Sequence, residues 1–296
     1  MWLLITIFAY AFNSLSLLIN KFLLTKKIKN SAVYAIFTCL LMSLAMFLLP
    51  FDWRAPTGYE FLIEVISGFL FGLGVYFMFS ALKAGETSRV IPILGGIQPL
   101  IVLPVAWFWL GEAVSPRFLV ALFLIIAGTV LISYGGGKIE KRAYWWSVLS
   151  ALFFAFSVVT LKAAFNSQAS FITPFALSRL GSILLGLILL LWPKNLRDIV
   201  KELKTPNKQS GGLFVVSQLA GGLSALLLNL AFAISVGVTA LINALQGLQY
   251  VFLLLAIIIL SRKFPSVLKE DIKTKILIQK ILATGLIIIG LAVVAF

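Results

Sequence analysis

Runs of about 20 apolar residues recur along the whole 296-residue chain, and no other feature limits its fold as strongly. A helix of about that length crosses the hydrocarbon core of a bilayer. The runs lack the alternation that marks the strands of membrane barrels. They therefore predict an all-α polytopic membrane protein with ten transmembrane helices. The segments are 2–20, 32–50, 62–82, 90–110, 117–134, 144–164, 172–192, 212–232, 238–260 and 276–296.

Composition and charge agree with this class and exclude others. Apolar residues make up 61% of the chain and charged residues only 11%, whereas a soluble domain needs a more polar surface. A net charge of +14 is also typical of nucleic-acid-binding proteins. In a membrane protein, however, Lys and Arg collect in the cytoplasmic loops. We therefore expect a small-molecule substrate and the lipid bilayer as partners, and no nucleic acid.

The basic residues also predict an orientation. Of the 24 Lys and Arg, Arg54, Arg117 and Lys162 lie on one face and Arg179 lies within a segment, which leaves 20 for the connections after the odd-numbered segments. The positive-inside rule places those connections in the cytoplasm and, with an even helix count, both termini outside. We expect an integral multi-pass protein of a prokaryotic cytoplasmic membrane, as a monomer or, alternatively, a homodimer.

Two connections are longer than the others and amphipathic. In "PKNLRDIVKELKTPNKQSGG", Leu196, Ile199, Val200 and Leu203 recur at helical spacing between basic residues. This pattern predicts a short helix on the cytoplasmic membrane surface. The stretch 261–275, "SRKFPSVLKEDIKTK", has a similar pattern.

The two halves of the chain share short sequence matches in the same order. "AGETSRVIPILGGIQPL" at 84–100 matches "SVGVTALINALQGLQYV" at 235–251, which pairs Gln98 with Gln249. "ALFLIIAG" at 121–128 matches "ATGLIIIG" at 283–290, and Ser16 corresponds to Ser157. The matches predict a five-helix unit in residues 1–137, the first half, and a second copy in residues 138–296, the second half. Because five is odd, the copies are inverted, as in secondary transporters, whose binding sites lie where the halves meet.

The chain resembles a known family at several of these places. "LGEAVSPRF" occupies 110–118, at the end of the 90–110 segment. Ala121 and Gly128 lie in the next segment, and "SRVIPI" occupies 88–93. These residues are similar to the EamA-like branch of the drug/metabolite transporter superfamily, whose members often also carry an Arg at the position of Arg179. The resemblance implies ten helices as two five-helix repeats and the transport of small metabolites. Two features depart from it: the second half has "LSRKF" where the first has "LGEAV", and many relatives have their termini inside.

The sequence gives no support for catalysis or for a cofactor. It contains no His and a single Cys, Cys39, which removes the commonest metal ligands. None of its ten acidic residues lies in the middle third of a predicted helix, where ionisable groups mark proton pathways. A nucleotide-binding GxxxxGK[ST] loop is also missing. We therefore expect no catalytic residue, metal or cofactor, and exchange or facilitated diffusion rather than proton coupling. Glu112 is expected to make a loop or helix-end contact.

Polar stripes mark the candidate binding site. On an ideal helix Asn243, Gln246, Gly247 and Tyr250 share one face, whereas Gln249 lies beside it. Similar stripes occur in 2–20, 90–110 and 212–232, the segments that the resemblance places around a central cavity. The substrate-binding candidates are Asn13, Ser16, Ser157, Arg179, Gln218, Asn229, Asn243, Gln246 and Tyr250. The alternative is that the amides only join helices, which is the role expected of Gln98 and Gln249. Arg179 is expected to bind an anionic group or, alternatively, to pair with backbone carbonyls or with a partner at an external gate.

A second set of residues is suited to gating or to helix bending. Glu86 and Arg89 are three residues apart and form either a cytoplasmic gate or a solvated surface pair. Prolines weaken a helix and let it bend. The gating or structural candidates are Glu86, Arg89, Pro92, Gly96, Pro99 and Gly247.

Taken together, these patterns predict a secondary transporter that moves small polar metabolites, such as amino acids or drug-like solutes, by alternating access. Two alternatives remain: a membrane-embedded lipid-modifying enzyme and a membrane scaffold protein.

Overall fold

Every regular element that the computed structural model describes is a helix. The described residues are 1–26, 30–85, 87–112, 115–133, 140–168, 170–204, 208–249, 251–253 and 274–295. The elements are α1 (Trp2–Lys26), α2 (Ser31–Leu41), the 3₁₀ helix η1 (Met42–Phe51), α3 (Gly58–Ala84), α4 (Thr87–Leu110), α5 (Pro116–Ser133), α6 (Lys141–Ser167), α7 (Ile172–Leu190), α8 (Pro193–Lys204), α9 (Lys208–Ile234), α10 (Thr239–Ala244) and α12 (Thr274–Ala295).

Seven helical stretches in the described part are long and apolar enough to cross a membrane. They are Trp2–Asn20, Ser31–Phe51, Gly58–Ala84, Val90–Leu110, Lys141–Ser167, Ile172–Leu190 and Gly211–Ile234. A shorter apolar helix, Pro116–Leu131, lies within α5. The predicted all-helical, multi-pass class is therefore confirmed, whereas the count of ten spans stays a prediction.

The start of α3 is set by a local sequence signal. Thr57 and Glu60 form a capping box, in which Glu60 N donates to Thr57 Oγ1 at 3.3 Å and Thr57 N donates to Glu60 Oε2 at 2.7 Å. The helix consequently begins at Gly58, four residues before the predicted segment at 62–82. This shift carries Glu64 from the expected membrane boundary into the second turn of the helix.

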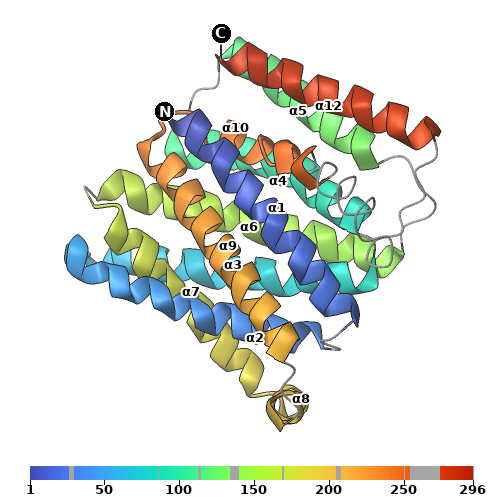
Figure 1. Ribbon diagram of the computed structural model, residues 1–296. Coiled ribbons are helices and arrows are strands. Elements are labelled where there is room, and N and C mark those ends of the chain that lie inside the picture. Colours follow the sequence, from blue (N-terminus) through green and yellow to red (C-terminus); the bar gives the residue numbers. More distant parts are fainter. Residues whose placement is uncertain are drawn as a thin grey trace.

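Contacts between the two halves build much of the bundle. α3 packs against α6 and α7, α1 packs against α9, and α4 packs against α6 and α10. Figure 1 shows α5 and α12 side by side at one edge of the molecule, with α7 and α8 toward the opposite edge. Each packed pair named here, including α5 with α12, takes one helix from either half.

Small residues let α5 and α12 approach closely, and they do so reciprocally. A Cβ on Gly128 would lie 2.7 Å from the Ala283 carbonyl oxygen, and one on Gly290 would lie 3.1 Å from that of Ala121. The sequence matches pair Ala121 with Ala283 and Gly128 with Gly290. Gly128 therefore packs on Ala283, and its sequence counterpart Gly290 packs on Ala121, which is the counterpart of Ala283.

A polar contact repeats in the same way. The Ser217 hydroxyl of α9 donates to the Ser16 carbonyl of α1 at 3.2 Å, and the Ser67 hydroxyl of α3 donates to the Ser157 carbonyl of α6 at 2.8 Å. Ser16 and Ser157 are counterparts in the sequence matches. The α1–α9 and α3–α6 contacts therefore share one kind of hydrogen bond, from a serine hydroxyl to a serine carbonyl.

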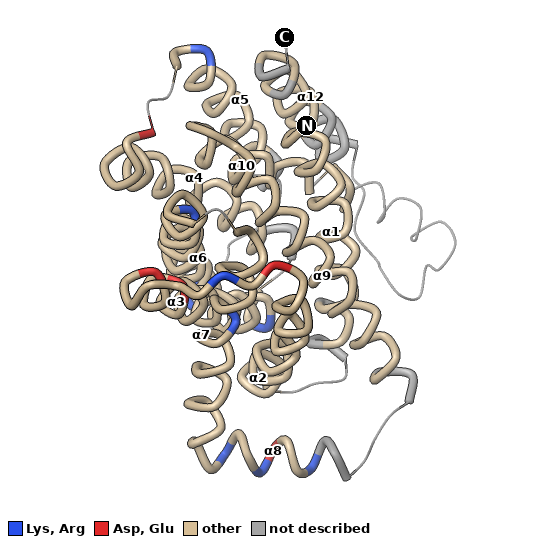
Figure 2. The backbone as a smooth tube through the Cα atoms, turned by 90° about the vertical axis from the view of Figure 1, so that its left-hand side faces the viewer, with Lys and Arg blue, Asp and Glu red and all other residues tan. Residues whose placement is uncertain are grey.

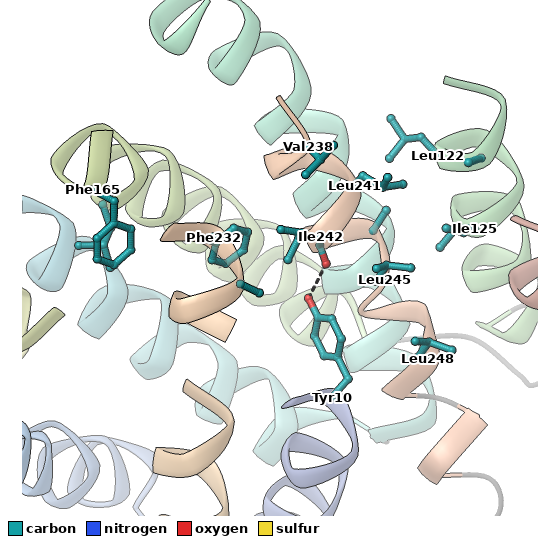
Figure 3. Packing of buried hydrophobic residues seen from close by; sticks show 14 of the residues in the cluster. Tyr10, Leu122, Ile125, Phe165, Phe232, Val238, Leu241, Ile242, Leu245 and Leu248 are labelled. Carbon is teal, nitrogen blue, oxygen red and sulfur yellow. Dashed lines mark hydrogen bonds between the residues drawn. The ribbon is translucent and has the colours of Figure 1, made fainter. Parts of the chain in front are cut away.

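The largest apolar cluster surrounds the start of α10. Figure 3 shows Leu241, Ile242 and Leu245 packed between Leu122 and Ile125 of α5 on one side and Phe232 of α9 on the other. Tyr10 of α1 reaches into this cluster and donates its hydroxyl to the Ile242 carbonyl at 2.9 Å. The cluster fixes α10 at the boundary between the halves.

α8 is the amphipathic helix predicted in the long connection. It follows α7 directly and crosses the end of the bundle, with basic residues spaced along it (Figure 2). Ile199 is buried against Val33 and Ile36 of α2, whereas Leu196 and Val200 are exposed. The second amphipathic stretch, 261–275, lies mostly outside the described residues; only its last two positions belong to α12.

Candidate functional site

The segment predicted as one helix over 238–260 is interrupted in the middle of its polar stripe. α10 ends at Ala244, Leu245 and Gln246 form a turn, and helical backbone resumes at Gly247. Across the turn, Leu248 N donates to Leu245 O at 2.9 Å and Gln249 N donates to Gln246 O at 3.0 Å. These are i to i+3 bonds, so the ideal helical wheel does not hold here. Broken helices of this kind form the binding sites of many transporters.

Amide side chains join the two halves at this break. Gln98 Nε2 of α4 donates to Asn243 Oδ1 of α10 at 2.7 Å, and Asn13 Nδ2 of α1 donates to Gln249 Oε1 at 2.9 Å. Asn243 is 2% exposed and Gln249 is fully buried. Gln98 and Gln249 thus join helices, as expected of them, and they do so through the two binding candidates Asn243 and Asn13. We call these four residues the amide seam.

A carboxylate continues the seam toward one end of the bundle. Glu112, after α4, accepts the Thr239 backbone N–H at 3.1 Å and the Thr239 hydroxyl at 2.6 Å. The Asn243 amide in turn donates to the Thr239 carbonyl at 3.1 Å. Glu112 therefore makes the predicted helix-end contact, on the first turn of α10. Beside it, the buried Lys162 donates to the Phe232 and Ser235 carbonyls at 2.7 and 2.6 Å.

Hydroxyl groups form a second polar cluster nearer the other end of α1. Asn20 Oδ1 accepts the hydroxyls of Tyr34 and Ser217. Asn20 Nδ2 donates to Ser16 Oγ at 3.3 Å, and the Ser16 and Ser217 hydroxyls are 3.3 Å apart. This cluster again connects α1 and α2 of the first half with α9 of the second.

The structure places the other binding candidates in different surroundings. Ser157 lies against Ser67, Gln218 lies on α9 beside the Tyr34 hydroxyl, and Gln246 is half-buried on the turn. The Asn229 amide donates to its own helix, at the Ala225 carbonyl, 2.7 Å away. Tyr250 lies outside the described residues.

The gating candidates lie mainly along α4. Pro92, Gly96 and Pro99 are part of one uninterrupted helix, so the break occurs in α10 instead. Gly96 and Gly247 both face α5, near Val130 and Thr129 respectively. Glu86 and the side chain of Arg89 lie outside the described part of the chain.

Arg179 is buried between two aromatic rings rather than within the amide seam. Its side chain is 3% exposed, and the guanidinium carbon lies 4.5 Å from the Phe175 ring centre and 5.3 Å from that of Phe71. Its Nε donates to the Phe175 carbonyl at 3.3 Å. The structure thus provides the carbonyl contact that was one of the expectations for Arg179, and cation–π contacts supplement it.

One buried carboxyl group escaped the sequence interpretation. Glu64 of α3 is fully buried, and Gln168 Nε2 donates to its Oε1 at 2.6 Å. Gln168 belongs to the connection between α6 and α7, so this contact also joins the halves. The capping box at Thr57 and Glu60 was the signal that could have found it, because the earlier helix start moves Glu64 from the first turn to the second.

Comparisons with known proteins agree with this architecture. Residues 1–134 match the model of the EamA-like transporter family. No curated protein sequence matches the chain significantly. Among solved structures, 29 chains match. One of them, a crystal structure titled only as that of a protein, is 18% identical, with a TM-score of 0.67 over 98% of this chain and 95% of its own. At that identity the likeness shows the fold alone.

Proposed function

We propose, from the match of residues 1–134 to the EamA-like transporter family, that this chain is a secondary transporter of small polar metabolites. Its substrates would be uncharged or zwitterionic, such as amino acids or drug-like solutes. The mechanism would be alternating access, in which the two halves separate first at one end of the bundle and then at the other.

The amide seam is the observation that carries this proposal. Its two hydrogen bonds, Gln98 to Asn243 and Asn13 to Gln249, each join the first half to the second. Such bonds between membrane helices contribute only about 0.6 kcal/mol each on average. They are therefore weak enough to open when the halves move. Once separated, the amides need new partners, because a buried polar group without one costs about 1–3 kcal/mol.

A polar solute fits that requirement. Amides offer both donors and acceptors, so they can bind hydroxyl, amino and carboxylate groups. The seam itself contains no charged residue, which favours a solute without net charge. Glu112 lies beyond one end of the seam, where it binds the first turn of α10, and Arg179 lies to one side, between aromatic rings.

The reciprocal contacts support an inverted duplication as the framework for this motion. The Ala121–Gly290 and Gly128–Ala283 packing, together with the repeated serine contacts, relates first-half helices to second-half helices. We propose ten membrane-spanning helices as two five-helix units, 1–137 and 138–296. The uneven distribution of Lys and Arg supports both termini lying outside, and a reporter fused to the C-terminus tests this orientation.

Uptake by reconstituted vesicles tests the proposed function. Labelled amino acids are screened first, and the best substrate is then measured with Gln98→Leu and Asn243→Leu. We expect both variants to fold and to lose most of their uptake, because leucine fills the space but cannot bind a polar solute. Thr160→Val is the matched control, since the Thr160 hydroxyl donates only to the Phe156 carbonyl of its own helix.

Three outcomes would overturn the proposal. Full uptake in both leucine variants would mean that the amides only join helices. Head-group or acyl transfer by the purified protein would support the lipid-enzyme alternative. Absence of any uptake, with a stable complex to another membrane protein, would support a scaffold.

A further inference from the structure

The contact between Glu64 and Gln168 contains two oxygen atoms that lack a donor. Gln168 Nε2 donates to Glu64 Oε1, but Glu64 Oε2 and Gln168 Oε1 are both buried and without a hydrogen-bond partner among the described residues. Glu64 is fully buried and Gln168 is 7% exposed. An ionised carboxylate can only accept hydrogen bonds, so it cannot satisfy the second oxygen of the amide.

The surroundings give the carboxylate no compensating positive charge within the described part of the protein. On α6, Lys162 is bound to the Phe232 and Ser235 carbonyls, and on α7, Arg179 is stacked on Phe71 and Phe175. These two helices pack most closely on α3, and their other cations, Lys141 and Arg142, lie in the first turn of α6, at the end opposite Glu64.

Other charged groups near this end are either acidic or exposed. Glu60 lies one turn earlier on the same helix and would repel a second negative charge. Asp52 accepts the Ser170 hydroxyl, and Arg54 is exposed on the η1–α3 connection. On α1 and α4, which also contact α3, the basic residues Lys21, Lys26 and Arg89 lie toward the end of the bundle opposite Glu64. α2 has no charged residue.

We propose that Glu64 binds a proton in this closed conformation and that it pairs with Gln168 as a neutral carboxylic acid. The proton sits on Glu64 Oε2 and is donated to Gln168 Oε1, while Gln168 Nε2 donates to Glu64 Oε1. The two side chains then form a closed ring with two hydrogen bonds. Both orphan oxygens are satisfied by one proton, which also removes the cost of burying an unpaired charge.

The position of this pair gives the proton a role, and this step rests on the proposed transport function. Glu64 belongs to the first half and Gln168 to the second, so separating the halves at this end breaks the ring. Water then reaches Glu64, its proton leaves to that water, and the hydrated carboxylate remains. Closing the same end again requires one proton from that side, so no net proton crosses the membrane. High pH on that side therefore favours the open state of this end and low pH favours the closed state, while substrate movement stays uncoupled from a proton gradient.

Infrared spectroscopy of the purified protein tests the protonated state without a substrate. At pH 7 we expect the carbonyl band of a protonated carboxylic acid from the buried Glu64. Exposed carboxyl groups do not contribute to this band, because they are ionised at that pH. The band should disappear in Glu64→Gln and persist in Glu60→Gln, the exposed neighbour. Absence of the band in the wild-type protein, or its survival in Glu64→Gln, would overturn the proposal. Because no transport is measured, this result is independent of the proposed function.

A vesicle experiment tests this role. The best substrate from the screen is measured as exchange of labelled for unlabelled solute, at equal pH on both sides and over a series of pH values. Glu64→Gln can form the same ring, amide to amide, so we expect it to fold and to exchange. Low pH should slow exchange in the wild-type protein and in Glu60→Gln, because it favours the closed state, whereas Glu64→Gln should lose this pH dependence. An equal pH dependence of exchange in Glu64→Gln and in the wild-type protein would contradict the role of Glu64.

Discussion

Single glycine residues set how closely the helices of the two halves approach. A Cβ on Gly68 of α3 would lie 1.4 Å from the Ser178 carbonyl oxygen, and one on Gly181 of α7 would lie 1.9 Å from that of Val65. Both obstacles are backbone atoms, which cannot move aside as a flexible side chain can. Two facing glycines thus let α3 and α7 pack almost in backbone contact.

We predict that Gly68→Ala lowers the free energy of unfolding by about 3 kcal/mol or more, because α3 and α7 must separate to admit the methyl group. Thermal unfolding in detergent measures the change. Gly212→Ala on α9 is the control, since nothing lies within 4 Å of a Cβ there. That substitution should be neutral or stabilise the helix by up to about 1 kcal/mol. Equal stability of the two variants would contradict the packing described.

The hydroxyl of Tyr34 offers a milder test of the polar cluster on α1 and α9. It donates to Asn20, whose amide oxygen also accepts the Ser217 hydroxyl. Tyr34→Phe removes one donor and leaves the ring packing on Phe79 and Phe214 unchanged. We expect a loss of about 0.5–1.5 kcal/mol in thermal unfolding measurements. An unchanged stability would mean that this hydrogen bond contributes nothing in the folded protein.

At the scale of single residues, the sequence could identify candidate polar residues but not their hydrogen-bond partners. Asn13 and Asn243 stand out in apolar segments, yet their partners Gln249 and Gln98 come from the other half of the chain. A helical wheel also favoured Gln246 over Gln249 for the polar stripe. The turn at Leu245 and Gln246 invalidates that projection, and the fully buried Gln249 is the one that binds Asn13.

Among the elements, α10 has its first turn capped by a residue outside the helix, Glu112. Glu112 accepts both the N–H and the hydroxyl of Thr239, which is fully buried. Without the carboxylate, these donors lose their partner in an apolar setting.

We predict that Glu112→Ala lowers the free energy of unfolding by about 1–3 kcal/mol, the cost of buried donors left without an acceptor. Glu112→Gln should lose less, because its carbonyl oxygen can still accept one of the two bonds. Thermal unfolding of both variants in one detergent tests the order. An alanine variant as stable as the glutamine variant would show that Glu112 does not cap α10.

Element boundaries explain what the sequence could and could not predict. Hydropathy located the apolar segments and the amphipathic α8, because both patterns span several turns. It missed the early start of α3, which depends on Thr57 and Glu60, and hence the burial of Glu64. It also gave no signal for the interruption in α10, which occurs in a stretch without proline.

For the whole molecule, the proposed transport cycle requires the halves to separate in turn at each end of the bundle. At one end the η1–α3 connection of the first half meets the α6–α7 connection of the second. Ser170 Oγ donates to Asp52 Oδ2 at 2.7 Å there, close in sequence to the Glu64–Gln168 pair. Asp52 is exposed, so reagents can reach this contact.

A reversible cross-link at this contact tests whether transport requires the halves to separate there. Asp52→Cys and Ser170→Cys are combined with Cys39→Ser, which removes the one native thiol. The control pair, Thr57→Cys with Glu60→Cys, forms its disulfide within the first half. We predict that oxidation abolishes substrate uptake only in the Asp52–Ser170 pair and that reduction restores it. Uptake that continues at the full rate with the Asp52–Ser170 disulfide completely formed would contradict alternating access by these two halves.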